Sequence, residues 1–268
     1  MEGQKTVRQR TVAVGSLMDK VVVSSSKNRT KTIAVFGAGS GLGASLATRF
    51  GREGYRIALV ARRSAPLEER VAELARAGIE AVAFPGDLTD LDNIPLLVRS
   101  IEQRLGSIDV AVYQPVDQLG FIPAVDLNAA KLKVLTTIFA FSPVEVSHAV
   151  LPGMLARGDG VIIVVGGLSA VVRMQGGGLS GIGPTMTTAS NYIFSLNTEV
   201  APRGVFAGIL NVGAVIEHSA GFRAMRAGGV LANEGYQLID PDDIAERLWM
   251  LVTKRNQVEA IIAPRPRK

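Results

Sequence analysis

The chain of 268 residues contains no cysteine and only two histidines. Disulfide bonds, thiol nucleophiles and cysteine-ligated metals are therefore excluded, and we expect no metal site built on histidine. Aromatic residues make up only 5% of the chain, whereas glycine occurs 29 times. That balance favours a parallel sheet punctuated by glycine turns over an aromatic-rich β-sandwich, and the length suits one α/β domain.

The net charge of +5 belongs to one end of the chain. Residues 1–31 hold seven basic and two acidic side chains, and the remaining residues carry 22 of each sign. A neutral body lacks the basic face that nucleic-acid binding requires, so we expect no nucleic-acid partner. We predict that 1–31 is a flexible basic extension, and an organellar presequence is the alternative interpretation.

Long apolar runs are also scarce. No segment approaches the about 20 apolar residues that a transmembrane helix needs, and the N-terminus lacks the apolar stretch of a secretory signal. We therefore expect no membrane partner and a cytoplasmic location. Residues 263–268 are predicted to form a short basic tail, which leaves 32–262 as one domain.

From Thr32 onward, short apolar runs alternate with amphipathic segments of helical length. The expected strands are Ile33–Phe36, Ile57–Val60, Ala81–Phe84, Val110–Tyr113, Val161–Val165 and Gly208–Val212. The expected helices are Leu42–Gly54, Pro66–Ala77, Leu91–Leu105, Ala129–Arg157 and Pro184–Ala201. This alternation predicts an α/β fold, a Rossmann-type doubly wound parallel sheet in a single domain. Pro143 should kink or break the longest helix, and Gly78 should cap the second one.

A glycine-rich loop follows the first expected strand and opens the first expected helix. Glycine permits the close approach of a phosphate to the backbone, and the helix N-terminus supplies N–H groups and a positive dipole end. A glycine motif between a strand and a helix predicts dinucleotide binding. The residues expected to contact the dinucleotide here are Gly37, Gly39, Ser40, Gly41, Leu42 and Gly43.

The second expected strand indicates which dinucleotide is bound. Arg62 and Arg63 stand where an NAD-binding protein would place an acidic residue on the ribose 2′-hydroxyl. Two guanidinium groups suit a 2′-phosphate, so we predict NADP(H); a solvated charge pair in a loop is the alternative. Asp87 and Leu88 follow the third strand and should reach the adenine, although Asp87 would also serve as a helix N-cap.

These motifs resemble the short-chain dehydrogenase/reductase family over about Thr32 to Leu251. Gly37, Gly41 and Gly43 match its Gly-x-x-x-Gly-x-Gly fingerprint. Further on, Leu151-Pro152-Gly153-Met154 resembles the end of its fifth helix, and Leu196-Asn197-Thr198-Glu199 resembles a segment of its sixth. The resemblance implies a small-molecule substrate and a homodimer or homotetramer. It also implies that Gly213 belongs to the loop after the last core strand, beside the cofactor.

The resemblance also assigns the family's catalytic positions to residues of this chain. The Asn, Ser, Tyr and Lys of the family fall on Phe139, Gly167, Ile182 and Met186. No lysine occurs between Lys133 and Lys254, so no shift of the alignment restores a Tyr-x-x-x-Lys pair. We expect these four residues to line a substrate pocket that lacks the usual proton donor.

Replacement donors should lie on the loops after the strands, where ligands bind in open α/β sheets. We nominate Tyr113 and Gln114 after the fourth strand, and Glu217 and His218 after the last core strand, as catalytic candidates. The alternatives are that Tyr113 only packs and that adjacent Glu217 and His218 point apart. Further polar residues of the substrate pocket are expected to be Asp117, Arg173 and Gln175, unless they are ordinary loop residues.

Three functions are consistent with this pattern. The first is an NADP(H)-dependent oxidoreductase with a non-standard active site, which reduces an activated carbonyl, imine or enone. The second is an NADP(H)-binding sensor or pseudoenzyme that carries out no chemistry. The third is a redox-neutral enzyme, a cyclase or isomerase, on the same scaffold. We expect the segment Ala220–Gly235 to cap the pocket in each case.

Overall fold

A computed structural model of the chain describes residues 29–116, 122–172, 180–227 and 237–264. Within these residues, Lys31 onward forms one compact α/β unit built on a seven-stranded parallel sheet. The strand order is β3-β2-β1-β4-β5-β6-β9, which confirms the predicted fold class. The strands of the sheet are β1 Thr32–Phe36, β2 Arg56–Ala61, β3 Ala81–Pro85, β4 Val110–Tyr113, β5 Gly160–Gly167, β6 Val205–Val212 and β9 Glu259–Ile262.

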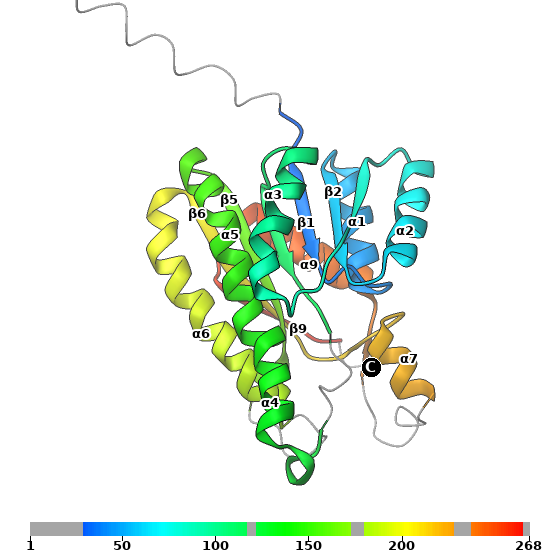
Figure 1. The fold of residues 1–268 in the computed structure, drawn as a ribbon, viewed down its shortest axis with the longest axis vertical. Helices are drawn as coiled ribbons and strands as arrows, with labels where there is room; N and C mark the ends of the chain where they lie inside the picture. The colour runs from blue at the N-terminus through cyan, green and yellow to red at the C-terminus, as the bar shows by residue number, and fades with distance from the viewer. Residues whose placement is uncertain (1–28, 117–121, 173–179, 228–236, 265–268) are drawn as a thin grey trace, which may run out of the picture. The chain divides into compact units, whose positions relative to one another are not determined.

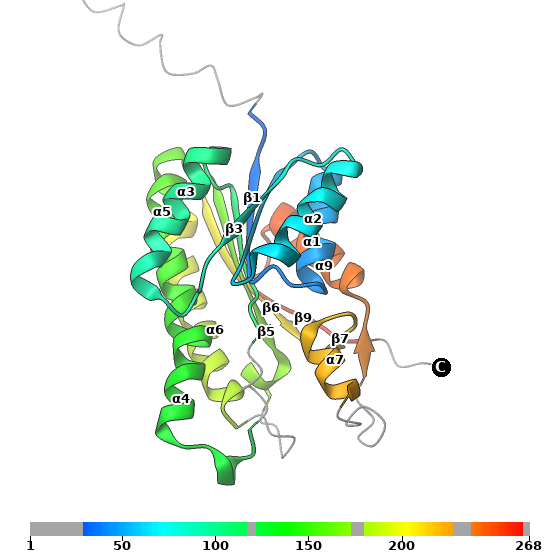
Figure 2. The ribbon, with the colours of Figure 1, turned by 45° about the vertical axis from the view of Figure 1, so that its right-hand side comes forward.

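Helices cover both faces of this sheet (Figures 1 and 2). On one face, α1, α2 and α9 pack against apolar side chains of the central strands. On the other face, α3, α5 and α6 do the same. Their bounds are α1 Leu42–Arg52, α2 Ser64–Arg76, α3 Ile94–Leu105, α5 Ser142–Arg157, α6 Ile182–Val200 and α9 Pro241–Lys254.

Burial on both faces explains the composition of the strands. All five residues of β1 and all eight of β6 are buried, and apart from Thr32 and Asn211 their side chains are apolar or absent. Strands that alternate apolar and polar residues would expose one face to solvent, whereas these are covered twice. The nearly continuous Val/Ile runs therefore fix these segments at the centre of the sheet.

Glycine ends several of the helices where the backbone turns left-handed, whereas α9 ends at Arg255 in this conformation. Gly78 follows α2 with φ of +74°, as predicted, and Gly158 follows α5 with φ of +64°. The N-terminus of α9 is capped instead by a side chain, because Asp240 accepts a hydrogen bond from the Asp242 N–H at 2.8 Å. These caps satisfy backbone groups that helix ends leave without partners.

The long apolar segment forms one continuous helical run, Ala129–Arg157, with a change of winding inside it. α4 (Ala129–Thr136) leads into the π-helical turn η4 (Thr137–Phe141), and Pro143 occupies the first turn of α5. The prediction of a local break is thus confirmed, because the α-helical hydrogen bonding is interrupted just before Pro143. Proline has no backbone N–H, so the interruption leaves no donor of Pro143 without a partner.

The same run corrects an expectation about membrane-length segments. By length and composition alone, it is apolar enough to cross a bilayer, with a mean hydropathy of 1.5 over its most apolar window. Half of that window is buried inside the protein. Val146, Val150 and Met154 of α5 pack in the core with α3 and the strands, which accounts for the apolar composition.

Several elements were not predicted from the sequence. These include the helix α9 and the strand β9. β9 forms the edge of the sheet beside β6, with which it pairs in parallel. Near the glycine loop, β7 pairs with β8 in a separate two-stranded sheet. The remaining short elements are η1 Leu91–Asn93, η3 Ala124–Asp126, η5 Leu168–Ala170, η6 Ala201–Arg203, β7 Val215–Ile216, α7 Ala220–Ala227 and β8 Leu238–Ile239.

Candidate functional site

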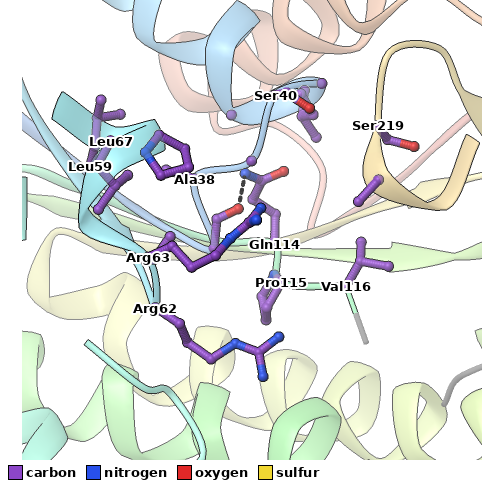
Figure 3. Close-up of a pocket in the computed structure, with 18 of the residues that line it drawn as sticks. Ala38, Ser40, Leu59, Arg62, Arg63, Leu67, Gln114, Pro115, Val116 and Ser219 are labelled. Carbon is purple, nitrogen blue, oxygen red and sulfur yellow. Dashed lines mark hydrogen bonds between the residues drawn. The ribbon is translucent and has the colours of Figure 1, made fainter. Parts of the chain in front are cut away.

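A cleft of about 620 Å³ opens at the C-terminal ends of β1 to β4. Each of these strands contributes the segment that follows it. The sheet order reverses between β1 and β4, and ligands bind at such a switch point in open α/β sheets. Among the residues that line the cleft are Gly37–Gly43, Arg62, Arg63, Gly86–Leu88, Gln114–Val116, Ile216, Ser219, Ala220 and Arg223. Ser219 marks the wall opposite Arg62 and Arg63 (Figure 3).

Two glycines of the loop after β1, Gly37 and Gly43, are required by close backbone contacts. Gly37 has φ of +90°, and a Cβ there would lie 2.6 Å from the backbone of Pro115. A Cβ at Gly43 would lie 2.8 Å from the Cα of Ala38. Both distances are shorter than any real Cβ contact, so side chains are excluded at these positions. The loop thus presents bare backbone to the cleft, as phosphate binding requires.

The loop is held in place by hydrogen bonds from its backbone to β2 and by Gln114. The N–H groups of Gly37 and Ala38 both donate to the carbonyl of Val60, at 2.9 and 2.8 Å. Gln114 is 8% exposed, and its Nε2 donates to the carbonyl of Gly37 at 2.8 Å (Figure 3). This bond gives Gln114 a positioning role in the glycine loop, distinct from the catalytic role that the sequence suggested.

Two guanidinium groups stand at the end of β2. Arg62 and Arg63 are exposed, and both side chains line the cleft below the glycine loop (Figure 3). Within the described residues, neither makes an ion pair, whereas neighbouring Arg70 pairs with Glu73 at 2.5 Å. Their positive charge is therefore not neutralised by a side chain and can meet an anionic group of a ligand.

Asp87 and Leu88 lie on the cleft wall after β3. The Oδ1 atom of Asp87 accepts hydrogen bonds from the Thr89 N–H at 2.9 Å and the Thr89 hydroxyl at 2.8 Å. This is an Asx turn, so the alternative prediction of a helix N-cap is wrong: the following short helix η1 begins after Asp90. Leu88 is buried, and its carbonyl accepts a hydrogen bond from Ser142.

Tyr113 is buried in the core. Only 3% of the residue is exposed, and its hydroxyl donates to the carbonyl of Ile138 in the π turn η4. Burial raises the pKa of Tyr113 well above its usual range, and a hydrogen bond with Ser142 opposes this only in part. A phenol held neutral on a backbone acceptor favours the packing alternative over a catalytic role.

Comparison with known proteins identifies the family. The short chain dehydrogenase family matches residues 31–215, which is more than half of the chain. The chain belongs to this family. Among its relatives, an NADP-dependent 3-hydroxy acid dehydrogenase from Schizosaccharomyces pombe is 26% identical over 234 residues, covering 85% of this chain and 89% of that protein.

Other similarities differ in extent. The glycine betaine reductase ATRR of Emericella nidulans is 26% identical over 242 residues, which are 88% of this chain but only 19% of that larger protein. The crystal structure of a metagenomic short-chain oxidoreductase in complex with NADP superposes with a TM-score of 0.73 at 23% identity. That superposition covers 88% of this chain and 99% of the other, and it shows a shared fold.

The structure brings together the four residues that the sequence resemblance predicts to stand at the catalytic positions of short-chain dehydrogenases. Phe139 and Ile182 are buried in one apolar cluster, and Met186 packs against it. The Sδ atom of Met186 accepts a hydrogen bond from the Gly167 N–H at 3.2 Å. A second space of about 10 Å³ is lined by Phe139, Met186 and Tyr113, and Pro115 lines both this space and the glycine-loop cleft.

The remaining nominees are placed elsewhere or are not described. Glu217 and His218 follow β7 but do not line the cleft; His218 is exposed, and its ring faces Phe222 at 6.5 Å between centroids. Gly213 donates its N–H to the carbonyl of Ile262 at 2.8 Å and also lies outside the cleft lining. Outside the described residues lie Asp117, Arg173 and Gln175.

Sequence reasoning missed the opposite wall of the cleft. Ile216, Ser219, Ala220 and Arg223 line it, and Arg70 of α2, which sequence reasoning also missed, lines the cleft as well. The expectation that a segment beginning at Ala220 would cap the pocket pointed to this wall without naming its polar groups; residues 228–236 of that segment lie outside the described residues. Among the described residues, no cluster of three or more His, Asp or Glu could hold a metal ion.

Proposed function

We propose that this short-chain dehydrogenase binds NADP(H) in the glycine-loop cleft. The loop offers backbone and the N-terminus of α1, whose Gly41 cap contributes no side chain to compete with a phosphate. Arg62 and Arg63 stand on the same cleft, form no ion pair with any described residue, and would bind the 2′-phosphate that distinguishes NADP from NAD. The homologue named as NADP-dependent supports the same choice.

We further propose that the protein reduces a substrate that is already activated. The observation that carries this is the apolar group formed by Phe139, Gly167, Ile182 and Met186, which contains no proton donor. In a reductase of the usual kind, an acid at this place contributes about 10²- to 10⁴-fold in rate. Without it, a neutral ketone would be reduced slowly.

An iminium is the substrate class that best fits such a wall. The bound cofactor would supply a hydride, and an iminium carbon that accepts it becomes a neutral amine without taking up a proton. The apolar side chains penalise the substrate's positive charge, and hydride transfer removes that charge from the substrate. A polarised enone is the other candidate, with water supplying its proton.

The same apolar group favours one alternative, a protein that binds NADP(H) but performs no turnover. All four positions would then be free of catalytic constraint while the cofactor cleft is retained. A redox-neutral cyclase or isomerase on this scaffold would likewise leave the nicotinamide unchanged. Both alternatives differ from the reductase in one measurable respect, which is that NADPH is never consumed.

The test is a titration followed by turnover assays. NADPH and NADH are titrated into the protein by fluorescence, and NADPH consumption is then followed with imine, enone and ketone panels. We expect tighter binding of NADPH and consumption with imines before ketones. Binding without consumption on every panel would favour the sensor or the redox-neutral enzyme, and an absence of binding would refute the proposal.

The cofactor preference has its own control. Replacing Arg62 and Arg63 by glutamine should weaken NADPH binding by about 10- to 100-fold and leave NADH nearly unchanged. Replacing Arg99 and Arg104, exposed on α3 and away from the cleft, removes the same charge and should change neither. Equal losses for both nucleotides would contradict the assignment of the two arginines to the 2′-phosphate.

We also infer that the protein assembles with copies of itself. Val134, Phe141 and Phe194 are 40%, 51% and 43% exposed on the neighbouring elements α4, η4 and α6. Large apolar side chains gathered on adjacent helices are a feature of subunit contacts. Light scattering after gel filtration should give a dimer or tetramer, and a monomer at micromolar concentration would contradict this inference.

A further inference from the structure

One backbone carbonyl joins the two walls of the cofactor cleft. The hydroxyl of Ser40, in the glycine loop, donates to the carbonyl oxygen of His218 at 2.9 Å. Nη1 of Arg223, on α7, donates to the same oxygen at 2.8 Å. Ser40 and Arg223 both line the cleft. Two donors, one from each wall, therefore converge on a single neutral acceptor beside the phosphate-binding loop.

The conformation of the loop before α7 makes this convergence possible. His218 has φ of +61°, in the left-handed region that non-glycine residues seldom adopt. Ser219 then caps α7, because its Oγ accepts a hydrogen bond from the Phe222 N–H at 3.0 Å. The turn from His218 to Ser219 directs the His218 carbonyl toward both Ser40 and Arg223.

The two walls are also packed directly against each other. A Cβ at Gly41 would lie 3.1 Å from both Cα and Cβ of Ser219, so even a methyl group there would press on the loop. The start of α7, which carries Arg223, is thus held beside the glycine loop by this packing.

The acceptor that these donors now share is weaker than a phosphate would be. A carbonyl oxygen is neutral, whereas a diphosphate oxygen is charged, and hydrogen bonds from a guanidinium to an anion are roughly twice as strong. Arg223 forms no ion pair among the described residues, so its charge remains available to an anion. Arginine also presents a fork that matches two oxygens of one phosphate group.

We propose that Arg223 is a direct ligand of the cofactor diphosphate, and that it exchanges the carbonyl of His218 for phosphate oxygens when the nucleotide binds. Ser40 makes the same exchange from the opposite wall. The His218 carbonyl is then a placeholder that keeps both donors pointed at the phosphate position. This inference rests on the proposed function, because it assumes that the cleft binds a nicotinamide dinucleotide.

A purely structural role for Arg223, as a tie between α7 and its preceding loop, makes a different prediction. A tie affects folding stability and would alter nucleotide binding only through the general state of the loop. A phosphate ligand affects every nucleotide that carries a diphosphate, whatever else that nucleotide carries. The 2′-phosphate and the nicotinamide ring should therefore make no difference to the loss.

The experiment measures binding of NADPH, NADH and ADP-ribose by calorimetry to the wild-type chain, Arg223→Gln and Arg226→Gln. Arg226 lies on the same helix, is exposed and does not line the cleft, so it is a matched control for charge. We expect Arg223→Gln to raise all three dissociation constants by about 10- to 100-fold and by similar factors. Arg226→Gln should leave them within twofold.

Two results overturn the inference without touching the proposed function. Wild-type-like binding by Arg223→Gln is one, and a loss confined to NADPH is the other, since it would move Arg223 to the 2′-phosphate. If the wild-type chain binds none of the three nucleotides, the proposed function fails as well. Should Arg223→Gln not fold, Arg223→Lys decides: it keeps the charge but not the fork, and we expect a weakening of several-fold that is equal for all three.

Discussion

The sulfur of Met186 lies 3.2 Å from the backbone nitrogen of Gly167 and accepts its hydrogen bond. This contact links helix α6 to the end of β5 through two positions at which the resemblance to short-chain dehydrogenases predicts lysine and serine. A thioether is a weak acceptor and cannot donate, so it fills the space without supplying a proton. Four predictions follow from this contact and from three other features of the site.

Restoring the family's side chains should create ordinary ketone reduction. In the variant Gly167→Ser, Ile182→Tyr, Met186→Lys, a serine Cβ would meet its nearest neighbour, Ser169 Oγ, at an ordinary 3.5 Å. We expect NADPH consumption with a simple ketone to rise by at least about 100-fold, since a general acid has been added. The isosteric control Ile182→Phe, Met186→Leu adds no acid and should show no gain. A folded, NADPH-binding triple variant without ketone reduction would contradict the prediction.

The substitution Gly37→Ala should reduce the free energy of unfolding and NADPH binding more than Gly54→Ala does. Both glycines have positive φ, +90° and +82°, so alanine is strained at either by roughly 1–2 kcal/mol. At Gly37 the Cβ would also meet the Pro115 backbone at 2.6 Å, whereas nothing lies within 4 Å at Gly54. Overlap adds about 1–3 kcal/mol and displaces the glycine loop. Denaturant unfolding and NADPH binding should separate the two variants; equal losses would count against the tight loop.

Tyr113→Phe should change how stability depends on pH. Removing the hydroxyl leaves the Ile138 carbonyl without this donor and should cost about 1 kcal/mol at pH 8. Burial raises the pKa of Tyr113 above its value of about 10 in the unfolded chain, so the unfolded state releases its proton first as pH rises. The stability that Tyr113 contributes is complete below pH 10 and is lost as pH rises through its folded pKa. The free energy of unfolding, measured with a chemical denaturant from pH 8 to 11, should therefore decrease less steeply with pH in the variant than in wild type.

His218 should tolerate glycine but not valine. Its left-handed backbone suits glycine, and a β-branched side chain there would be strained by about 1–2 kcal/mol. We expect the free energy of unfolding of His218→Gly to lie within about 0.5 kcal/mol of the wild-type value, because relief of backbone strain offsets the greater conformational freedom of the unfolded chain. Thermal unfolding of both variants measures this difference. If His218→Gly still bound the nucleotide but lost the turnover of wild type, the result would support a role of the His218 imidazole as a proton relay.

The strands and the glycine loop were predictable because their sequence signals are local. A run such as Val161–Val165 can be buried on both faces only inside a parallel sheet, and the glycines from Gly37 to Gly43 lie in one short segment that runs from a strand into a helix. Arg62 and Arg63 follow their strand directly. In each case, neighbouring residues in the chain determine the position, so periodicity and spacing were sufficient.

The opposite wall of the cleft could not be predicted in the same way. The position of Arg223 depends on the left-handed turn at His218 and on the approach of Ser219 to Gly41, which is 178 residues away in the chain. The hydrogen bonding of the Tyr113 hydroxyl depends on a π turn that contains Ile138, 25 residues further along the chain, because this turn supplies the acceptor carbonyl. α9 and β9 were missed because β9 is a four-residue strand whose pairing with β6 is set by the whole sheet.

The late place of β9 in the chain bears on how the protein is made. β6, with all eight residues buried, borders the sheet until β9 pairs with Ile209–Val212 and the Asn211 side chain meets Glu259 at 2.8 Å. During synthesis, some 50 residues must leave the ribosome after β6 before that partner exists. An unpaired apolar edge recruits other chains. The nascent protein therefore passes through a stage at which chaperones have a defined strand to protect.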